Sequence, residues 1–449
     1  MRSMVVVFPF SSIGNRYGFL WNPVRLWRLP KSLKLMTFRI LHTSDWHLGH
    51  TLHDVSRAFE HEAFFTWLLD TIASEQIDAL VIAGDIFDVA NPSAIAQKQW
   101  YRFLSAARER FPNLDILAIA GNHDSSARLE APVALLEALN MHVIGWLPRK
   151  ECGSIDLDRL IVPLHNAKGE VAAVCAAVPF LRPADLPRLP DATDALIDGV
   201  KEIYQQAIAG AVERRKDQQA ILVTGHCYMA SSSISDLSER KILGGNEHAL
   251  PAELFTEEVD YVALGHLHLA QEVAEQKTVR YSGSPIPLSM SEVDYPHQVC
   301  VVTFEGREVV SVETPLVPRA VDLLRIPAEE PKEKYLVLRE LAKLPKQREG
   351  EQLPFLEVRI RLERPESGLR GEVAEALEGK HARLVKLTVE TTGSGAVLAH
   401  GAAQKQLHDL QPDDVFRDLY KSKHCGEVPA ELMDCFHEIL ETVQHGEEL

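Results

Sequence analysis

The chain has 449 residues, too many for one compact core, and with 46% hydrophobic and 25% charged residues its composition is ordinary for a globular protein. A formal net charge of −17 argues against nucleic-acid binding over the whole surface, but it leaves room for a local groove or for bound metal ions. Six scattered cysteines form no Cys-x-x-Cys pair, which predicts a reducing cytoplasmic location rather than a disulfide framework.

Residues 1–36 differ from the rest of the chain because they carry six basic residues and no acidic one. A targeting peptide would explain the charge, but the longest apolar run there, Met4 to Phe10, is short for a signal core. An upstream start codon would make Met36 the natural first residue, and we favour this explanation. No run approaches the roughly eighteen apolar residues of a membrane span, so we expect no membrane association.

From Met36 onward, short apolar strands alternate with helical patterns. Continuous apolar strands separated by helices predict a sheet that is covered on both faces, as in α/β proteins. Helical spacing at 58–73 assigns six residues to a buried face: Phe59, Phe64, Phe65, Leu68, Leu69 and Ile72. The predicted helices are 58–73, 94–110 and 131–139, and the predicted strands are 38–41, 79–83, 116–120, 172–178, 220–224, 261–264, 279–282, 298–304 and 308–312.

A composition shift near 325–335 predicts a domain boundary. Beyond it, a helix at 332–343, a strand at 355–362, a helix at 368–378 and a strand at 382–391 predict a small α+β module. Gly393-Ser394-Gly395 is a predicted hinge, and the segment after it has amphipathic helical spacing. We therefore expect a basic extension at 1–36, a catalytic domain at 37–325, a second domain at 326–395 and C-terminal helices at 396–449.

Five short polar segments each follow a predicted strand, and the carboxyl ends of such strands are where ligands bind. An isolated Gly-Asp or Gly-His is more often a plain turn, so the prediction depends on the ordered set. Together the segments supply carboxylate, amide and imidazole ligands without thiolates, which suits two divalent ions, most of all Mn²⁺, with Fe, Zn or Mg as alternatives. The segments are Asp45-Trp46-His47, Gly84-Asp85 with Asp88, Gly121-Asn122-His123-Asp124, Gly225-His226 and Gly265-His266-Leu267-His268.

The spacing of the segments suggests a role for each side chain. Asp45 and His47 lie one residue apart and can serve the first metal, to which His268 can turn back. Asp85 is the natural bridging carboxylate. The remaining predicted ligands serve the second metal: Asn122, His226 and His266.

His123 follows a predicted ligand and should therefore face the phosphate rather than the metal. It is our candidate for protonating the leaving oxygen or stabilising the transition state. Asp88, three residues past the bridging carboxylate, could hold His123 in one tautomer and raise its pKa.

This ordered set resembles the motifs of the calcineurin-like metallophosphoesterase superfamily, and all five are intact. The resemblance implies a four-layer β-sandwich flanked by helices, and it carries the metal ligands over to the seven residues named above. Purple acid phosphatases have a tyrosine where this chain has Asp88, which disfavours that branch. The flanking stretches 40–49, 83–88, 263–268 and 281–289 are more similar to the SbcD family, the nuclease subunits of bacterial SbcCD complexes. Some archaeal relatives have histidine at the position of Asp88.

The SbcD resemblance is strong over about residues 37–320 and implies a Mn²⁺-dependent double-strand DNA exonuclease and single-strand or hairpin endonuclease for DNA repair and recombination. It also implies that 326–395 is a capping domain that helps to select DNA, and that the terminal helices dock on an SMC-like ATPase subunit of the SbcC type. The resemblance further implies that this chain forms a dimer within the complex and that the complex is associated with the nucleoid. No Gly-x-x-x-x-Gly-Lys-Ser/Thr motif occurs, so any ATP dependence must come from the partner.

Two arginines are candidate contacts to DNA phosphates. Arg57 and Arg128 lie just after the first and third motifs, although each also fits a surface salt bridge. Two other functions stay open: a small-molecule phosphodiesterase or phosphatase of the same superfamily, and a non-catalytic scaffold on that fold. The intact ligand set counts against the scaffold, and the C-terminal modules count against a minimal phosphatase.

Overall fold

The fold is that of a computed structural model, which describes residues 37–190, 193–216, 218–230, 232, 249–347, 350–364, 366–391, 412–423 and seven residues between 428 and 440. Two features predicted from the sequence, the basic extension at 1–36 and the hinge at 393–395, lie outside the described residues. No helix in these ranges combines the length and the apolar character that membrane crossing requires.

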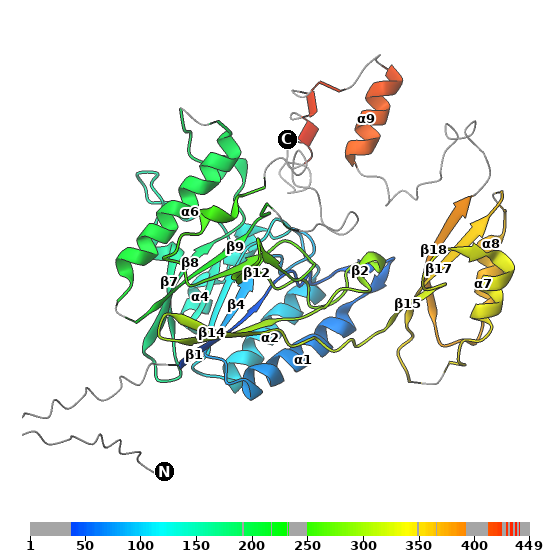
Figure 1. Cartoon of the computed structure of the whole chain (residues 1–449), viewed down its shortest axis with the longest axis horizontal. Helices are drawn as coiled ribbons and strands as arrows, with labels where there is room; N and C mark the ends of the chain where they lie inside the picture. Colours follow the sequence, from blue (N-terminus) through cyan, green and yellow to red (C-terminus); the bar gives the residue numbers. More distant parts are fainter. Residues whose placement is uncertain are drawn as a thin grey trace, which may run out of the picture. The chain divides into compact units, whose positions relative to one another are not determined.

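The first sheet of the described chain has six strands in the order β14-β13-β1-β4-β5-β6. Figure 1 labels three of them, β14, β1 and β4. The strands β1, β4, β5 and β6 run parallel, while β13 runs antiparallel to β1. Their bounds are Thr37–Thr43 for β1, Ala79–Ala83 for β4, Asp115–Ile119 for β5, Met141–Ile144 for β6, Cys300–Glu305 for β13 and Glu308–Glu313 for β14.

Successive residues of the first sheet pack into two different cores, because side chains alternate between the faces of a strand. Ile40 and Val81 belong to the core that this sheet shares with the second sheet. Leu41 and Leu80 belong to the core under two helices, α1 (Ala58–Ser74) and α2 (Ala94–Arg110). Burial on both faces explains why these strands are continuously apolar in the sequence.

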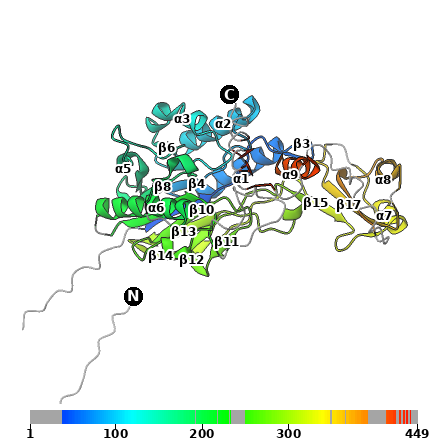
Figure 2. The ribbon, with the colours of Figure 1, turned by 90° about the horizontal axis from the view of Figure 1, so that it is seen from above.

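The second sheet also has six strands among the described residues, in the order β11-β12-β10-β9-β8-β7. Helix α6 (Ala195–Arg214) packs on this sheet and lies in front of it in the view from above (Figure 2), so helix, sheet, sheet and helix form four layers from the top to the bottom of Figure 1. The predicted α/β fold with a helix-flanked sandwich is confirmed. The strand bounds are Ile161–His165 for β7, Val171–Val178 for β8, Ala220–His226 for β9, Tyr261–Gly265 for β10, Gln271–Val273 for β11 and Gln276–Tyr281 for β12.

Three details differ from the predictions. The helix predicted at 131–139 is the shorter α4 (Val133–Glu137), and an unpredicted short helix, α3 (Ser126–Glu130), precedes it; Pro132 separates the two because it cannot continue a helix. Phe59 is 51% exposed, whereas the other five residues predicted for that face of α1 are buried or half-buried. Helix α6 was not predicted. The short elements are β2 Thr51–Leu52, β3 Val55–Ser56, α5 Leu157–Leu160, η1 Pro183–Asp185, η3 Ala252–Leu254 and η4 Met290–Glu292.

A third sheet with its own apolar core follows, and it contains the four elements predicted beyond residue 331. Strand β17 (Phe355–Leu362) pairs in parallel with β15 (Leu323–Ile326), β16 (Lys332–Glu333) and β18 (Arg383–Thr391). The predicted boundary at residue 325 falls within β15, and the division into domains stays a prediction. The helices are α7 Lys334–Leu341 and α8 Leu369–Ala376 and, nearer the C-terminus, α9 Pro412–Lys423.

Candidate metal centre

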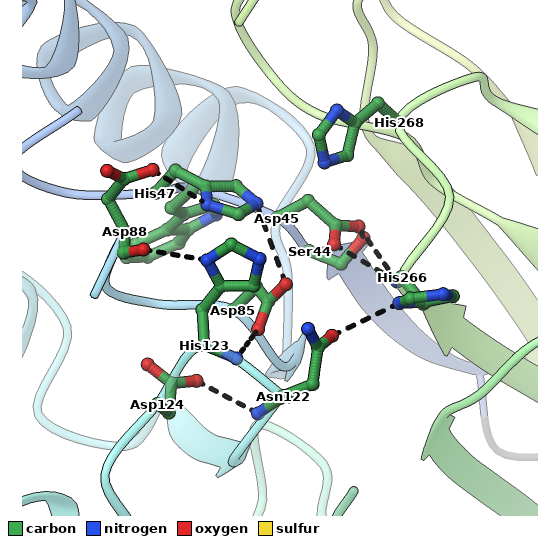
Figure 3. A network of polar contacts seen from close by, with 12 residues as sticks. Ser44, Asp45, His47, Asp85, Asp88, Asn122, His123, Asp124, His266 and His268 are labelled. Carbon is green, nitrogen blue, oxygen red and sulfur yellow. Dashed lines mark hydrogen bonds and ion pairs between the residues drawn. The ribbon is translucent and has the colours of Figure 1, made fainter. Parts of the chain in front are cut away.

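The five polar segments predicted from the sequence come together at the carboxyl ends of β1, β4, β5, β9 and β10 (Figure 3). The backbone N–H of His266 donates to the Asp45 carboxylate at 3.0 Å, although 221 positions separate the two residues. Asn122 Oδ1 lies 3.0 Å from His226 Nε2 and 3.2 Å from His266 Nδ1. Carboxyl ends of strands from both sheets therefore meet at this centre.

Three groups of side chains each place one ligand atom per residue within 4.8 Å of one another. The groups overlap, so they form one continuous centre and not three separate sites. They are Asp45 with His47 and His268, His47 with Asp85 and His123, and Asp45 with Asp85 and His226. With Asn122 and His266 beside His226, the structure brings all seven predicted ligands together; their assignment as ligands stays a prediction.

Four of these residues have a positive φ, which residues other than glycine seldom adopt: 54° at Asp45, 48° at His47, 49° at Asp85 and 108° at His266. Backbone hydrogen bonds between the loops hold the conformation. The N–H of Asp45 donates to Gly84 O at 3.0 Å, and that of His47 donates to Asp85 O at 3.0 Å. Such strain persists where the surrounding structure over-determines it, and it often marks a functional site.

Two motif glycines are required by the close approach of the loops. A Cβ at Gly84 would lie 2.3 Å from His226 Nδ1, and one at Gly265 would lie 1.9 Å from Ala83 O. Any side chain at either position would therefore separate the two sheets at the centre. In these two motifs the glycine serves the packing, while the following residue is the predicted ligand.

The charges of the centre are strongly coupled. Burial opposes ionisation of Asp85, but the neighbouring His226 and His123 hold its pKa well below the usual range. Burial alone would lower the pKa of His226, yet the charge of Asp85, 3.3 Å from Nε2, raises it to about 9. Burial together with the charge of His226 lowers the pKa of His266 to about 3. The metal-free centre thus favours a proton on His226, one of the predicted ligands.

The imidazole nitrogens of His47 and His226 also fit a pair of divalent ions, because each ring can direct a lone pair into the centre. His47 Nε2 is buried and makes no hydrogen bond with the described residues, although Asp85 Oδ2 lies 3.6 Å away. A buried nitrogen without a hydrogen bond is costly, unless its lone pair has a ligand to meet. His226 Nδ1 lies 2.8 Å from the backbone oxygen of Ala83, and because a carbonyl only accepts, Nδ1 keeps its proton and the lone pair of the neutral ring lies on Nε2.

Asp88 does not contact His123 in the way predicted. His123 Nδ1 lies 2.7 Å from the backbone oxygen of Asp88, whereas the Asp88 carboxylate lies 3.3 Å from His47 Nδ1. Asp88 thus holds the His123 ring through its backbone oxygen and not through its carboxylate, and the predicted effect of Asp88 on the pKa of His123 stays a prediction. His47 in turn overcomes the effect of burial and lowers the pKa of Asp88 to about 2.

Asp124 has a structural role that the sequence did not indicate. Its buried carboxylate accepts hydrogen bonds from the backbone N–H groups of Ile86 at 3.1 Å, Phe87 at 2.9 Å and Gly121 at 2.9 Å. Burial and the nearby charge of Asp85 raise its pKa to about 6. Asp124 therefore ties the loop after β4 to the loop after β5, and the third motif needs its last residue for this reason.

The two candidate DNA contacts have different environments. Arg57 is completely buried: it pairs with Glu60, donates to Pro287 O at 2.6 Å and lies 5.3 Å from the ring centroid of Phe355. Its assignment as a phosphate contact is wrong, because no phosphate could reach it. Arg128 is exposed on α3, and its contact with DNA stays a prediction.

Replacing Arg57 with alanine should lower the free energy of unfolding by about 3–5 kcal/mol, because Glu60 would keep a buried charge without its partner. Urea unfolding followed by tryptophan fluorescence measures this loss. The matched control is Arg128→Ala, which removes an exposed arginine and should change stability little. Equal stability of the two variants would contradict the structural role of Arg57.

Comparison with known proteins agrees with this fold and site. Residues 38–270 match the family model described as calcineurin-like phosphoesterase, and residues 319–424 match the one described as type 5 capsule protein repressor C-terminal domain. The first match covers more than half of the chain, so the fold and the centre are those of a calcineurin-like phosphoesterase. The resemblance seen in the motifs is thereby confirmed.

The relatives narrow the family further. The chain is 39% identical over 357 residues to the SbcD subunit of the nuclease SbcCD from Rhodobacter capsulatus, a match that covers 78% of this chain and 87% of that protein. It is 38% identical over 290 residues to the SbcD subunit from Escherichia coli K12, a match that covers 62% of this chain and 68% of that protein. It is also 38% identical over 271 residues to the SbcD subunit from Bacillus subtilis 168, a match that covers 59% of this chain and 66% of that protein. The chain belongs to the SbcD family of nuclease subunits and is a metal-dependent phosphodiesterase.

Proposed function

We propose that this chain is a Mn²⁺-dependent double-strand DNA exonuclease and single-strand or hairpin endonuclease. It would act as the nuclease subunit of an SbcCD-type repair and recombination complex. The observation that carries the proposal is the buried cluster of carboxylate, amide and imidazole groups around Asp85, with His123 beside it. The relatives, each an SbcD subunit of the nuclease SbcCD, supply the substrate class.

The ligands divide between two ions. Asp45, His47 and His268 would hold the first ion, and Asp85 would bridge the pair. Two adjacent divalent ions lower the pKa of water and stabilise the charge on a phosphoryl group during an in-line displacement. The donor set is nitrogen and oxygen without thiolate, which favours Mn²⁺ over soft metals. The second ion would take the remaining ligands: Asn122, His226 and His266.

His123 is the chain's own candidate for proton transfer. Because the backbone oxygen of Asp88 can only accept, His123 Nδ1 must donate to it, and the ring is held in one orientation. Nε2 is then the atom from which a proton would pass to the leaving 3′ oxygen of the DNA strand. The N–H of His123 also donates to Asp85 Oδ1 at 2.8 Å, which fixes the catalytic group to the bridging carboxylate.

The remaining parts of the complex are proposed from the C-terminal half. The module at 326–395 would cap the site and help to select DNA, and Arg128 would contact a DNA phosphate. On α9, Val415 and Leu419 are 45% and 51% exposed, which suits docking of an apolar helix face into a groove of the SMC-like ATPase. We further propose that the chain forms a dimer in that complex, in the cytoplasm at the nucleoid.

The test is to incubate the purified chain with Mn²⁺ and linear or hairpin DNA, alone and with its ATPase partner, beside bis-p-nitrophenyl phosphate. Cleavage of DNA with Mn²⁺, and its loss in EDTA, is the expected result. Cleavage of the small ester alone would identify a small-molecule phosphodiesterase instead. Metal binding without cleavage of either substrate would identify a scaffold.

Mn²⁺ affinity should rise with pH between about pH 7.5 and 8.5, by up to about tenfold per unit. In the metal-free centre the charge of Asp85 outweighs burial and raises the pKa of His226 to about 9, so an ion must displace a proton below that pH. Ordinary histidines are already neutral in this window. Calorimetric titration of the metal-free chain at several pH values measures the slope; an affinity independent of pH would contradict a protonated His226.

A further inference from the structure

Glu292 is a fully buried carboxylate next to the metal centre that belongs to none of the five motifs. It lies in η4 (Met290–Glu292), and its Oε1 is 3.0 Å from His268 Nδ1. Its other oxygen, Oε2, accepts the N–H of Leu288 at 2.8 Å. Both carboxylate oxygens thus have partners, and the partner of one of them is the imidazole of a proposed ligand.

The chemistry of this contact fixes the imidazole. An ionised carboxylate has no proton to give, so His268 Nδ1 must donate to it, and the lone pair of the neutral ring must then lie on Nε2. We propose that Glu292 is a positioning residue that presents His268 Nε2 to the first metal ion. This inference rests on the proposed function in one respect, the assignment of His268 as a ligand.

The same arrangement occurs at the other imidazole of the first ion. His47 Nδ1 faces the Asp88 carboxylate at 3.3 Å, and its Nε2 is the buried nitrogen without a hydrogen bond. A carboxylate behind an imidazole makes the metal-bound nitrogen more basic, and its removal typically costs about 10–100-fold in metal affinity. At the second ion, by contrast, His226 Nδ1 faces a neutral backbone oxygen, that of Ala83. The first ion should therefore depend on side-chain carboxylates in a way that the second does not.

The loop that carries Glu292 is fixed on both sides of it. Arg57 donates to Pro287 O at 2.6 Å, and Arg325 donates to the backbone oxygen of Met290. His297 Nε2 lies 3.1 Å from the backbone oxygen of Glu292 itself. A supporting carboxylate held in this way is preorganised, so it does not have to be ordered when the ion binds. These contacts also give the buried Arg57 a place in the architecture of the site.

The variant Glu292→Gln tests the proposal, because it keeps the shape of the side chain but loses its charge. Mn²⁺ is titrated calorimetrically into the metal-free chain, with thermal unfolding in EDTA as the measure of folding. The wild type should bind two ions. Glu292→Gln should keep one ion at wild-type affinity and bind the other about 10–100-fold more weakly. The matched control is Glu130→Gln, which alters a buried carboxylate that accepts the N–H of Gly145 and should leave both affinities unchanged.

A double variant separates positioning from general support of the fold. If Glu292 acts through His268, then Glu292→Gln combined with His268→Gln should bind Mn²⁺ no more weakly than His268→Gln alone. Fully additive losses, or two ions bound by Glu292→Gln with wild-type affinity, would overturn the inference. A wild type that binds two ions but cuts no DNA would overturn the proposed function and leave this inference intact.

Discussion

Replacing His123 with asparagine is expected to lower the rate of DNA cleavage by about 10²–10⁴-fold while two Mn²⁺ ions remain bound. The imidazole donates to the backbone oxygen of Asp88, and the backbone N–H of His123 donates to Asp85, so the ring is oriented before any substrate arrives. Asparagine occupies a similar volume but cannot transfer a proton at neutral pH. The measurements are single-turnover cleavage of a linear duplex and calorimetric Mn²⁺ stoichiometry.

Stoichiometry decides between two roles for His123, because its ring also lies within ligand distance of His47 and Asp85. Loss of an ion in the asparagine variant would make His123 a metal ligand and not the proton donor. Retention of wild-type cleavage would remove it from the mechanism altogether. A substrate with a better leaving group, such as bis-p-nitrophenyl phosphate, should lose less activity in this variant, since its leaving oxygen needs no proton.

Replacing Asp85 with asparagine should have the largest effect of any single substitution at the centre. Its carboxylate lies 3.3 Å from His226 Nε2 and 3.6 Å from His47 Nε2, one imidazole on each side of the proposed pair. Removal of a group that only supports a ligand already costs about 10–100-fold in affinity, so loss of the shared ligand should weaken both ions by more than about 100-fold. Calorimetric titration should then detect no tight Mn²⁺ site, and DNA cleavage should fall to background.

A control variant at the opposite end of the first sheet shows whether the loss of Mn²⁺ binding is specific to Asp85 or follows from the loss of any buried carboxylate charge. Asp115 begins β5, is 4% exposed and lies 3.0 Å from His165 Nδ1. Asp115→Asn should retain both ions and cleavage, even if the chain becomes less stable. Retention of one tight ion in Asp85→Asn would mean that this carboxylate serves one metal and does not bridge the pair.

Most of the sandwich could be predicted because its strands are short, apolar and bounded by sharp polar turns. The predicted bounds of β4 and α2 agree with the structure to the residue. The long helix α6 was missed because its sequence contains Gly199 and Gly210, which weaken the helical pattern; both glycines lie where the helix packs closely, on Leu186 and Ile161. Close packing of that kind depends on the partner surface, which the local sequence does not contain.

The candidate site was predicted as a set of residues but not as a set of contacts. The motifs name seven candidate ligands because each lies at a strand end, and topology alone brings strand ends together. They do not show which way a side chain turns, so Asp88 was placed on His123 when its carboxylate faces His47. Arg57 was misread for a related reason. The signal that could have corrected it was Glu60, an opposite charge three residues further along a helix.

The position of β1 in its sheet has a consequence for the order in which the protein can be made. Strand β1 begins the described chain, yet one of its edges pairs with β13, Cys300–Glu305. Until the ribosome has released that segment, the edge of β1 is open, and pairings so distant in sequence form slowly. His266 and His268 also come late in the chain. A nascent chain therefore carries no complete metal centre, and the phosphodiesterase activity arises only when nearly the whole catalytic domain has been synthesised.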